Sequence, residues 1–457
     1  MANFNLRKNP VKEGNTPYWT VLQSVRGYII SRFPDILGND DNDSTVVSDA
    51  KKEKLKNMIS RYISTEKLSV GLFSDAELVT RLYNDLAEYS ILTDYIKDEN
   101  NEIEEINVNA WNDIEVRYSN GESKKVEAFC NMEHAKTILR KLATAGGALL
   151  DDAIPMAEAS LTNNTRVVVL NHPIVDADVG TCCSIRLLKP QFAKREFFIN
   201  NGTVTEEEMR FLELAIRSGV SMVFVGATGS GKTTLMNYLL GTIPNDQRII
   251  TIEHNARELS LVKKDEDGKI LNNVVHLQTR PHELPQYDIS QEDLVVKALR
   301  LDPRIICVGE MRDSEAYAAQ EASLTGHTVV TSLHADGVDA THHRIATLAL
   351  KRYPIDINVA MVQAAMAFPV IVYLSKLEDH SRHVMEIAEC TLTEDKNTLL
   401  RHYTTLYEYQ IKNNIIENGH VKIEAEHRHD GAISARLRKT MMINGATAEE
   451  VQSIMPK

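Results

Sequence analysis

Hydrophobic residues recur at helical spacing in three stretches near the start of the chain. These stretches run from Tyr18 to about Phe33, from Lys51 to Ile63 and from Asp75 to Asp94. Apolar residues at i, i+3 and i+4 predict amphipathic helices. Ser74 directly precedes the third stretch and is suited to capping a helix. We therefore predict three helices, with a loose arm over residues 1–20 and a flexible acidic loop over residues 38–48 between the first two.

The pattern then changes to short segments in which polar and apolar residues alternate, as in strands. These segments run from Ile103 to Val108, Asp113 to Tyr118, Lys124 to Phe129, Thr165 to Leu170 and Cys182 to Leu188. Asn120-Gly121 is a favourable hairpin turn, and a helix from His134 to Ala145 is followed by two glycines. This order predicts a small α+β domain.

Mostly apolar strands that alternate with helices occupy the chain after Thr205. The strands run from Met222 to Val225, Arg248 to Glu253, Ile305 to Val308 and Thr328 to Leu333. Such alternation predicts a mostly parallel sheet with helices on both faces. We divide the chain into a helical extension (1–70), an α+β domain (71–188), a linker (189–205), an α/β domain (206–413) and a polar C-terminal tail (414–457).

Composition and charge narrow the function. The 457 residues carry a net charge of −13, which argues against a protein whose main task is to coat nucleic acid. The five scattered cysteines are typical of reduced thiols in the cytosol. The most apolar stretch, from Ile357 to Leu374, is interrupted by Asn358, Gln363 and Pro369, whereas a membrane span needs about 20 apolar residues. We predict a buried helix followed by a strand there, and only peripheral contact with a membrane.

A glycine-rich segment between a predicted strand and a predicted helix fits G-x-x-x-x-G-K-[ST], the phosphate-binding P-loop. Its residues are Gly226, Ala227, Thr228, Gly229, Ser230, Gly231, Lys232 and Thr233, followed by Thr234. Glycines let successive backbone N–H groups face phosphate oxygens, and the following helix adds its positive end. Lys232 supplies a point charge for the β- and γ-phosphates, and the Thr233 hydroxyl can ligate Mg²⁺.

Three strands end in groups that can act beside such a loop. Glu253, Glu310 and His334 each follow an apolar strand, and a doubly wound sheet binds its ligand at the carboxyl ends of its strands. Glu310 is placed to hold Mg²⁺ or to polarise a water, and Glu253 is placed to orient the attacking water. The alternatives are an exposed strand-end acid for Glu310 and a structural histidine for His334.

Further short segments occur in a fixed order around these groups. They are Ile106-Asn-Val-Asn109, Thr165-Arg166, Ser184-Ile185-Arg186, Thr251-Ile252-Glu253 with Glu258-Leu259, Gly309-Glu310-Met-Arg312-Asp313, and Thr325-Gly326-His327 through His334-Ala335. From roughly Leu86 to Tyr409 the chain thereby resembles the type II/type IV secretion ATPase superfamily, most closely its CpaF/TadA-type pilus-assembly branch.

This resemblance implies a PAS-like domain hinged to a RecA-like ATPase domain. It implies a hexamer that uses ATP and Mg²⁺ at the cytoplasmic face of a membrane, where it drives a platform protein of a pilus or secretion system. The acidic balance and the lack of a basic, aromatic-rich stretch predict no direct contact with nucleic acid. The roles it assigns are phosphate and Mg²⁺ binding for Lys232 and Thr233, activation of water for Glu253, the Walker B acid for Glu310, γ-phosphate sensing for His334, and charge neutralisation for Arg166 and Arg186. Arg280 and Arg300 lie in matching segments, and any of these arginines can instead pair with a surface acid.

Two departures from the family pattern leave alternatives open. The acidic box usually reads Ile-Glu-Asp-x-x-Glu-Leu, whereas residues 252–259 are one residue longer and lack the Asp. Either Glu253 keeps its position at the strand end or the register shifts toward Glu258; we prefer Glu253. Glu158-Ala159-Ser160 stands where the family usually has an arginine. A scaffold that binds nucleotide with little hydrolysis, and a conjugation-type ATPase that drives nucleoprotein transfer, remain as alternative functions.

Overall fold

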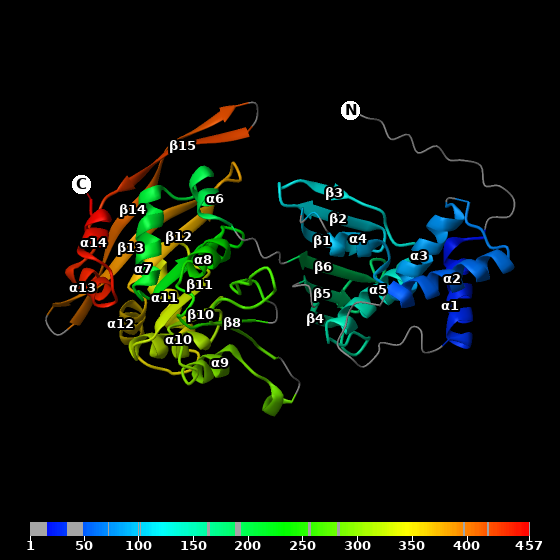
Figure 1. Cartoon of the computed structure of the whole chain (residues 1–457), viewed down its shortest axis with the longest axis horizontal. Coiled ribbons are helices and arrows are strands. Elements are labelled where there is room, and N and C mark those ends of the chain that lie inside the picture. The colour runs from blue at the N-terminus through cyan, green and yellow to red at the C-terminus, as the bar shows by residue number, and fades with distance from the viewer. Residues whose placement is uncertain are drawn as a thin grey trace. The chain divides into compact units, whose positions relative to one another are not determined.

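The computed structural model describes residues 16–33, 49–71, 73–98, 100, 102–161, 165–187, 193–254, 257–280, 284–395, 398–417 and 420–456. The acidic loop predicted at 38–48 and most of the predicted N-terminal arm lie outside these residues. The chain divides into two compact units, Met1–Lys189 and Pro190–Lys457, coloured from blue to green and from green to red in Figure 1.

Three helices form a small bundle in the first unit, as predicted. They are α1 (Tyr18–Arg32), α2 (Asp49–Thr65) and α3 (Asp75–Ala87). Their apolar faces meet at Val25, Ile59 and Leu82, all fully buried. Ser74 caps α3 in a reciprocal capping box with Glu77.

The third helix is shorter than the sequence pattern predicted. After Ala87 the chain forms a 3-10 turn (Ser90–Leu92) and the short helix α4 (Thr93–Lys97). Lys141 lies across this break, with its ammonium group donating to the carbonyl oxygens of Leu86, at 2.9 Å, and Glu88, at 2.7 Å. A cation that satisfies the last carbonyl groups stabilises the end of the helix there.

The sheet of the first unit is antiparallel, with the strand order β3-β2-β1-β6-β5-β4. The strands are β1 (Ile103–Ala110), β2 (Asp113–Tyr118), β3 (Ser123–Lys125), β4 (Met156–Leu161), β5 (Thr165–Asn171) and β6 (Thr181–Leu187). Helix α5 (Met132–Ala145) covers one face, where Ile138 and Leu142 pack with Ile106 and Val167. This is the small α+β domain predicted from the sequence, and its PAS-like character stays a prediction.

The second unit is built on a nine-stranded sheet with the order β15-β14-β13-β12-β7-β11-β10-β8-β9. The strands are β7 (Met222–Val225), β8 (Ile249–Glu253), β9 (Val274–Gln278), β10 (Ile305–Val308), β11 (Thr328–Leu333), β12 (Val370–Lys376), β13 (Arg382–Asp395), β14 (Thr398–Glu417) and β15 (His420–His429). The run from β12 to β9 is parallel, and β13 to β15 add antiparallel strands at one edge. Because β11 lies between the P-loop strand β7 and the Glu310 strand β10, this is the predicted RecA-like arrangement.

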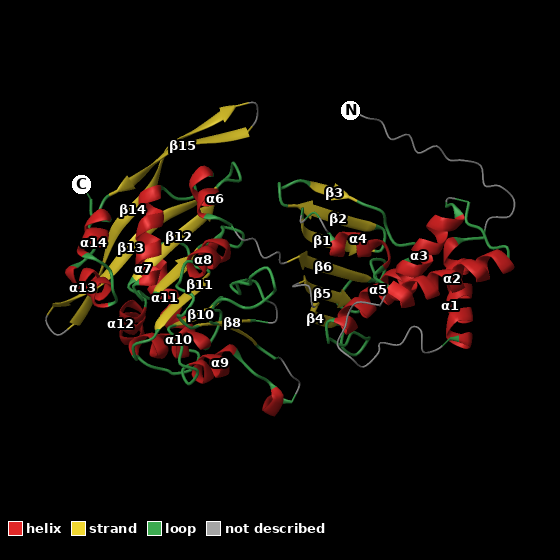
Figure 2. Cartoon of the chain, viewed as in Figure 1, coloured by secondary structure: helices red, strands yellow, loops and turns green. Residues whose placement is uncertain are grey.

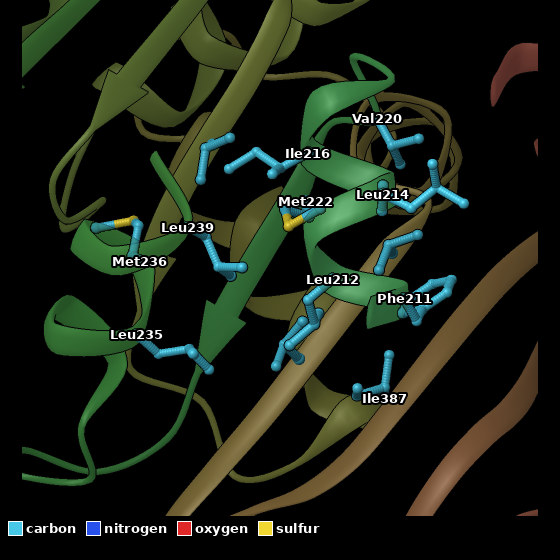
Figure 3. Close-up of a cluster of buried hydrophobic side chains, with 14 of the residues drawn as sticks. Phe211, Leu212, Leu214, Ile216, Val220, Met222, Leu235, Met236, Leu239 and Ile387 are labelled. Carbon is cyan, nitrogen blue, oxygen red and sulfur yellow. The ribbon is translucent and has the colours of Figure 1, made fainter. Parts of the chain in front are cut away.

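Helices cover both faces of this sheet (Figure 2). They are α6 (Arg195–Asn200), α7 (Glu206–Arg217), α8 (Lys232–Gly241), α9 (Gln291–Ala298), α10 (Glu315–Leu324), α11 (Val338–Ala349), α12 (Ile357–Ala367), α13 (Ala435–Ile443) and α14 (Ala448–Ser453), with a 3-10 turn at Pro285–Tyr287. Successive residues of β7 enter opposite cores, since Met222 packs in one and Val223 in the other. Figure 3 shows Met222 facing Leu212 of α7 and Leu239 of α8.

Two stretches that the sequence pattern marked as irregular contain regular elements. Helix α6 forms inside the stretch taken as a linker, and β15, α13 and α14 form in the stretch taken as a polar tail. Leu437 and Met441, four residues apart on α13, are buried in the main core. Helices this short show too few turns for their period to be recognised in sequence. The apolar stretch after Ile357 forms a helix and a strand as predicted, and no described helix is long and apolar enough to cross a membrane.

Candidate nucleotide site

The loop between β7 and α8 depends on its glycines. Gly226, Gly229 and Gly231 have φ values of 141°, 77° and 98°, which disfavour any residue with a side chain. A Cβ on Gly226 would lie 2.0 Å from the carbonyl oxygen of Leu374 on β12. Only glycine fits there, and the loop ends at the positive end of α8, where anions bind.

Lys232 is held inside the loop. Its side chain donates from Nζ to the carbonyl oxygens of Gly226 and Ala227, both at 2.8 Å. Burial lowers the pKa of Lys232, and the negative charges of Glu310 and Glu258 oppose that shift. The Ser230 hydroxyl is buried and has no hydrogen-bond partner among the described residues. The loop thus contains both a cation, Lys232, and a hydroxyl group without a hydrogen-bond partner among the described residues, that of Ser230.

The parallel register brings the predicted strand-end groups to one edge of the sheet. Val308 pairs with Ile252 of β8 and with Thr331 of β11, and Leu333 pairs with Val225 of β7. His334 follows β11 and reaches in two directions. Its Nδ1 lies 3.0 Å from the carbonyl oxygen of Gly226, and its Nε2 lies 3.1 Å from Oε1 of Glu310. The imidazole therefore lies between the P-loop and Glu310.

Glu310 is an anionic carboxylate. Burial raises the pKa of Glu310. The Arg312 guanidinium, 2.5 Å away, has the opposite effect, and the charges of His334 and Lys232 add to it. Together they hold the pKa of Glu310 below its ordinary value. A half-buried anion beside the P-loop lysine suits the binding of a divalent cation.

Glu253 lies in a different environment from Glu310. Its side chain is buried, and Oε1 accepts hydrogen bonds from the backbone N–H groups of Glu258, at 2.7 Å, and Leu259, at 2.8 Å. Oε2 is buried without a hydrogen-bond partner in the described part of the chain. Burial raises the pKa of Glu253 to about 7, with the two backbone bonds opposing the shift. A carboxylate with one free oxygen and a pKa near neutrality is suited to accept a proton.

Gly309 makes room for Glu253. A Cβ at Gly309 would lie 3.2 Å from Cγ of Glu253, closer than such atoms normally approach. Because Gly309 has no side chain, the side chain of Glu253 can lie against the end of β10. The sequence motif contains this glycine, but its contact with Glu253 is apparent only in the structure.

Glu258, the alternative acid, also reaches the P-loop. The Thr233 hydroxyl donates to Oε2 of Glu258 at 3.4 Å. Residues 255 and 256 of the acidic box lie outside the described residues. The structure thus keeps Glu253 at the end of β8 and places Glu258 beside the threonine of the P-loop.

Arg382 is a contact of the P-loop that sequence reasoning missed. It begins β13, and its Nε donates to the carbonyl oxygen of Gly229 at 2.8 Å. Its Cδ would lie 3.6 Å from a Cβ at Gly231. The only signal in the sequence is a cation at the start of a strand, which many strands share.

Arg166 and Arg186 lie in the first unit, directly opposite each other on β5 and β6. Both alternate with buried residues, so they are on the sheet face opposite α5. Arg166 forms a 3.4 Å ion pair with Glu158, where the family usually has an arginine. Their role at a nucleotide stays a prediction.

A family model described as "Type II/IV secretion system protein" matches residues 95–451. The chain belongs to this family. Proteins of the type II/IV secretion family are ATPases, and this chain is one of them.

Relatives of known sequence agree with this assignment. An uncharacterized protein of Methanocaldococcus jannaschii is 26% identical over 339 residues, which are 67% of this chain but only 44% of that protein. The type IV secretion system protein PtlH of Bordetella pertussis is 28% identical over 320 residues, covering 63% of this chain and 90% of PtlH.

A solved structure, the VirB11 ATPase from the Brucella suis type IV secretion system in complex with sulphate, is 24% identical. The matched region covers 64% of this chain and 90% of the VirB11 chain, and the TM-score is 0.34. The fold assignment rests on the strand order described above.

Proposed function

We propose that this chain is a hexameric motor ATPase that powers assembly of a type IV-like pilus or type II/IV-type secretion. It acts on a platform protein from the cytoplasmic face of the membrane. Family membership supports the class of function. The observation that carries the motor proposal is the imidazole of His334, which lies between the P-loop and Glu310. A motor needs such a link, because the state of the phosphate must be passed to the rest of the fold.

ATP is bound through its phosphates by the backbone of residues 226–231 and by Lys232. The ammonium group exchanges its two loop carbonyl partners for phosphate oxygens. The Thr233 hydroxyl and the Glu310 carboxylate offer hard oxygen donors, which fit Mg²⁺. When bound, Mg²⁺ neutralises charge on the β- and γ-phosphates.

Glu253 accepts the proton of the attacking water through Oε2. The two backbone N–H groups hold the other oxygen and so fix the orientation of the carboxylate. Positioning and charge neutralisation supply most of the rate in phosphoryl transfer. For Arg166 and Arg186, charge neutralisation at the transferred phosphate is the role that the family resemblance implies.

Steady-state ATP hydrolysis as a function of protein concentration tests the proposal. Specific activity should rise with concentration, because sites in a ring are completed on assembly. Lys232→Ala should abolish nucleotide binding, and Glu253→Gln should bind ATP but lose turnover. Glu258→Gln is the matched variant and should keep substantial turnover. Intact hydrolysis in Glu253→Gln with loss in Glu258→Gln would assign the base to Glu258 instead.

A nucleotide-binding scaffold is the second candidate. Its support is that one oxygen of Glu253 already holds the loop of residues 258 and 259, which is a structural task. The scaffold predicts oligomers stabilised by nucleotide and a low, concentration-independent turnover that Glu253→Gln leaves unchanged.

For the conjugation-type alternative, the net charge of −13 counts against direct handling of DNA. Tight, salt-sensitive binding of single-stranded DNA would favour it.

A further inference from the structure

A second group of reactive side chains lies in the first unit, where α1, α3 and α5 meet. Cys130 precedes the N-cap of α5, His134 lies in the first turn of α5, and Asp85 lies in the last turn of α3. The Sγ atom of Cys130 is 3.0 Å from Nδ1 of His134. The Nε2 atom of His134 is 3.1 Å from Oδ1 of Asp85. A nucleophile thus contacts a base, and the base contacts a carboxylate that can orient it.

The hydrogen bonds determine which ring nitrogen carries the proton. An ionised carboxylate only accepts hydrogen bonds, and Asp85 also accepts one from the Tyr18 hydroxyl. Nε2 of His134 must therefore donate to Asp85. Nδ1 accepts from the backbone N–H of Cys130 at 3.4 Å, so its lone pair is on the side of Sγ. The geometry allows the thiol proton to pass to Nδ1.

The surroundings fix the imidazole while leaving the sulfur accessible. The side chains of His134 and Asp85 are each 4% exposed. The rings of Trp19 and Phe129 lie 5.6 Å and 5.3 Å from the imidazole, centre to centre. Cys130 is exposed.

Charge also favours the protonated form of the imidazole. Burial lowers the pKa of His134, but its hydrogen bonds to Asp85 and Cys130 outweigh burial and raise the pKa to about 9. The groups facing the imidazole are Asp85 from α3 and Cys130 beside α5, with the Tyr18 hydroxyl of α1 and the Ser90 hydroxyl next to them. Two cations, Arg81 of α3 and Lys141 of α5, also interact electrostatically with Asp85.

We propose that Cys130 is a reactive thiol that exchanges with low-molecular-weight disulfides, with His134 as its base and Asp85 as a positioning residue. Sγ attacks one sulfur of the disulfide, so a mixed disulfide forms as the original S–S bond breaks. The departing thiolate takes the proton held on Nδ1 and leaves as a thiol. Atoms and electrons balance with the disulfide as the sole oxidant.

The remaining cysteines differ from Cys130 in burial. Cys183, Cys307 and Cys390 are buried, and Cys182 is partly exposed. Burial raises the pKa of Cys182 above its ordinary value, which disfavours its thiolate. Exchange should therefore be selective for Cys130. The mixed disulfide places a new group where α1 and α3 join the sheet domain.

The experiment treats the full chain with oxidised glutathione, locates the adduct by peptide mass spectrometry and measures the exchange rate against pH. At neutral pH we expect Cys130 to react at least about 10-fold faster than Cys182. Cys130→Ser should remove the fast reaction, and the matched variant Cys182→Ser should keep it.

The pH profile separates a base from a merely structural histidine. The wild type should react faster than His134→Gln, and the difference should be largest at neutral pH, where an ordinary thiol with a pKa of about 8.5 is mostly protonated. Asp85→Asn should lower the rate at neutral pH and recover it at high pH. If the wild-type profile is already that of an ordinary thiol, or if Cys182 reacts as fast as Cys130, the proposal is wrong. The wild-type profile decides even if a variant fails to fold.

Discussion

His334 lies 3.1 Å from Glu310, measured from its Nε2 to Oε1 of the carboxylate, while its Nδ1 lies 3.0 Å from the carbonyl oxygen of Gly226. One imidazole thus touches the first residue of the P-loop and the acid after β10. A phosphate that displaces the Gly226 contact would therefore move a ring that lies directly beside Glu310.

His334→Gln should lower kcat because the ring no longer spans these two groups. We expect about a 10–100-fold loss of kcat, with ATP affinity changed less than about threefold, since the phosphate cradle itself is intact. Hydrolysis and nucleotide binding measured on the same preparation separate the two effects. His343→Gln, an exposed histidine on α11, is the matched control. Equal losses in kcat and affinity would contradict a linking role.

Gly309→Ala should move the Glu253 carboxylate. The new Cβ would meet Cγ of Glu253 at 3.2 Å, so the side chain must shift by a few tenths of an ångström. We expect kcat to fall about 10-fold or more with ATP binding retained, because small misplacements of a base are costly. Gly27→Ala is the control: a Cβ there meets nothing within 4 Å, and the change should stabilise α1 by about 0.5–1 kcal/mol. Full activity in Gly309→Ala would show that the contact is unimportant.

The pH dependence of turnover should report Glu253. Burial raises the pKa of this carboxyl group to about 7, and a base acts only when it is deprotonated. The rate should therefore rise with pH through neutrality and level off above it. A kcat profile of the wild type and of Glu258→Gln checks this, and both should share the acidic limb. A limb that is absent from the wild type, or lost in Glu258→Gln, would exclude Glu253 as the titrating group.

Arg382→Ala should weaken nucleotide binding more than turnover. Its guanidinium donates to the Gly229 carbonyl oxygen, and it brings positive charge to the phosphate loop. We expect the Kd for ATP to rise about 5–50-fold, the size of a lost charge-assisted hydrogen bond. Lys376 pairs with Arg382 in the register of the β12–β13 hairpin. Lys376→Ala therefore removes a cation of the same hairpin, and a loss of equal size there would attribute the effect to overall charge.

His427 should make the second unit less stable as pH rises. Nδ1 of His427 lies 2.9 Å from Oε1 of the buried Glu208 on α7. Burial lowers the pKa of His427, but Glu208 outweighs burial and raises it. The folded chain then binds more protons than the unfolded chain above the ordinary histidine pKa of about 6.5. This stabilisation is complete below that pH and is lost as pH rises through the raised pKa.

Thermal unfolding of His427→Gln tests this relation. The free energy of unfolding of the variant should depend less on pH than that of the wild type just above pH 6.5. His402→Gln, an exposed histidine on β14, should leave the slope unchanged. An identical slope in the wild type and in His427→Gln would rule out the ion pair as its source.

The sequence by itself determined the longer helices, the central strands of the α/β domain and the local chemistry at their ends. The P-loop was recognisable because its glycines and Lys232 must follow one another at fixed spacing. Glu253, Glu310 and His334 were predicted to share one edge because parallel strands place their carboxyl ends together. The cap of α3 at Ser74 was also predictable from sequence, because a helix cap depends only on neighbours a few residues away.

Only the tertiary structure decided which distant residues meet. Arg382 contacts Gly229, which is 153 positions away in the chain. The missing side chain of Gly309 leaves room for Glu253. His134, next to Cys130, contacts Asp85 of another helix. The helices α13 and α14 are too short for their period to predict their burial. Each of these contacts depends on strand order and helix packing, which no local pattern of apolar and polar residues encodes.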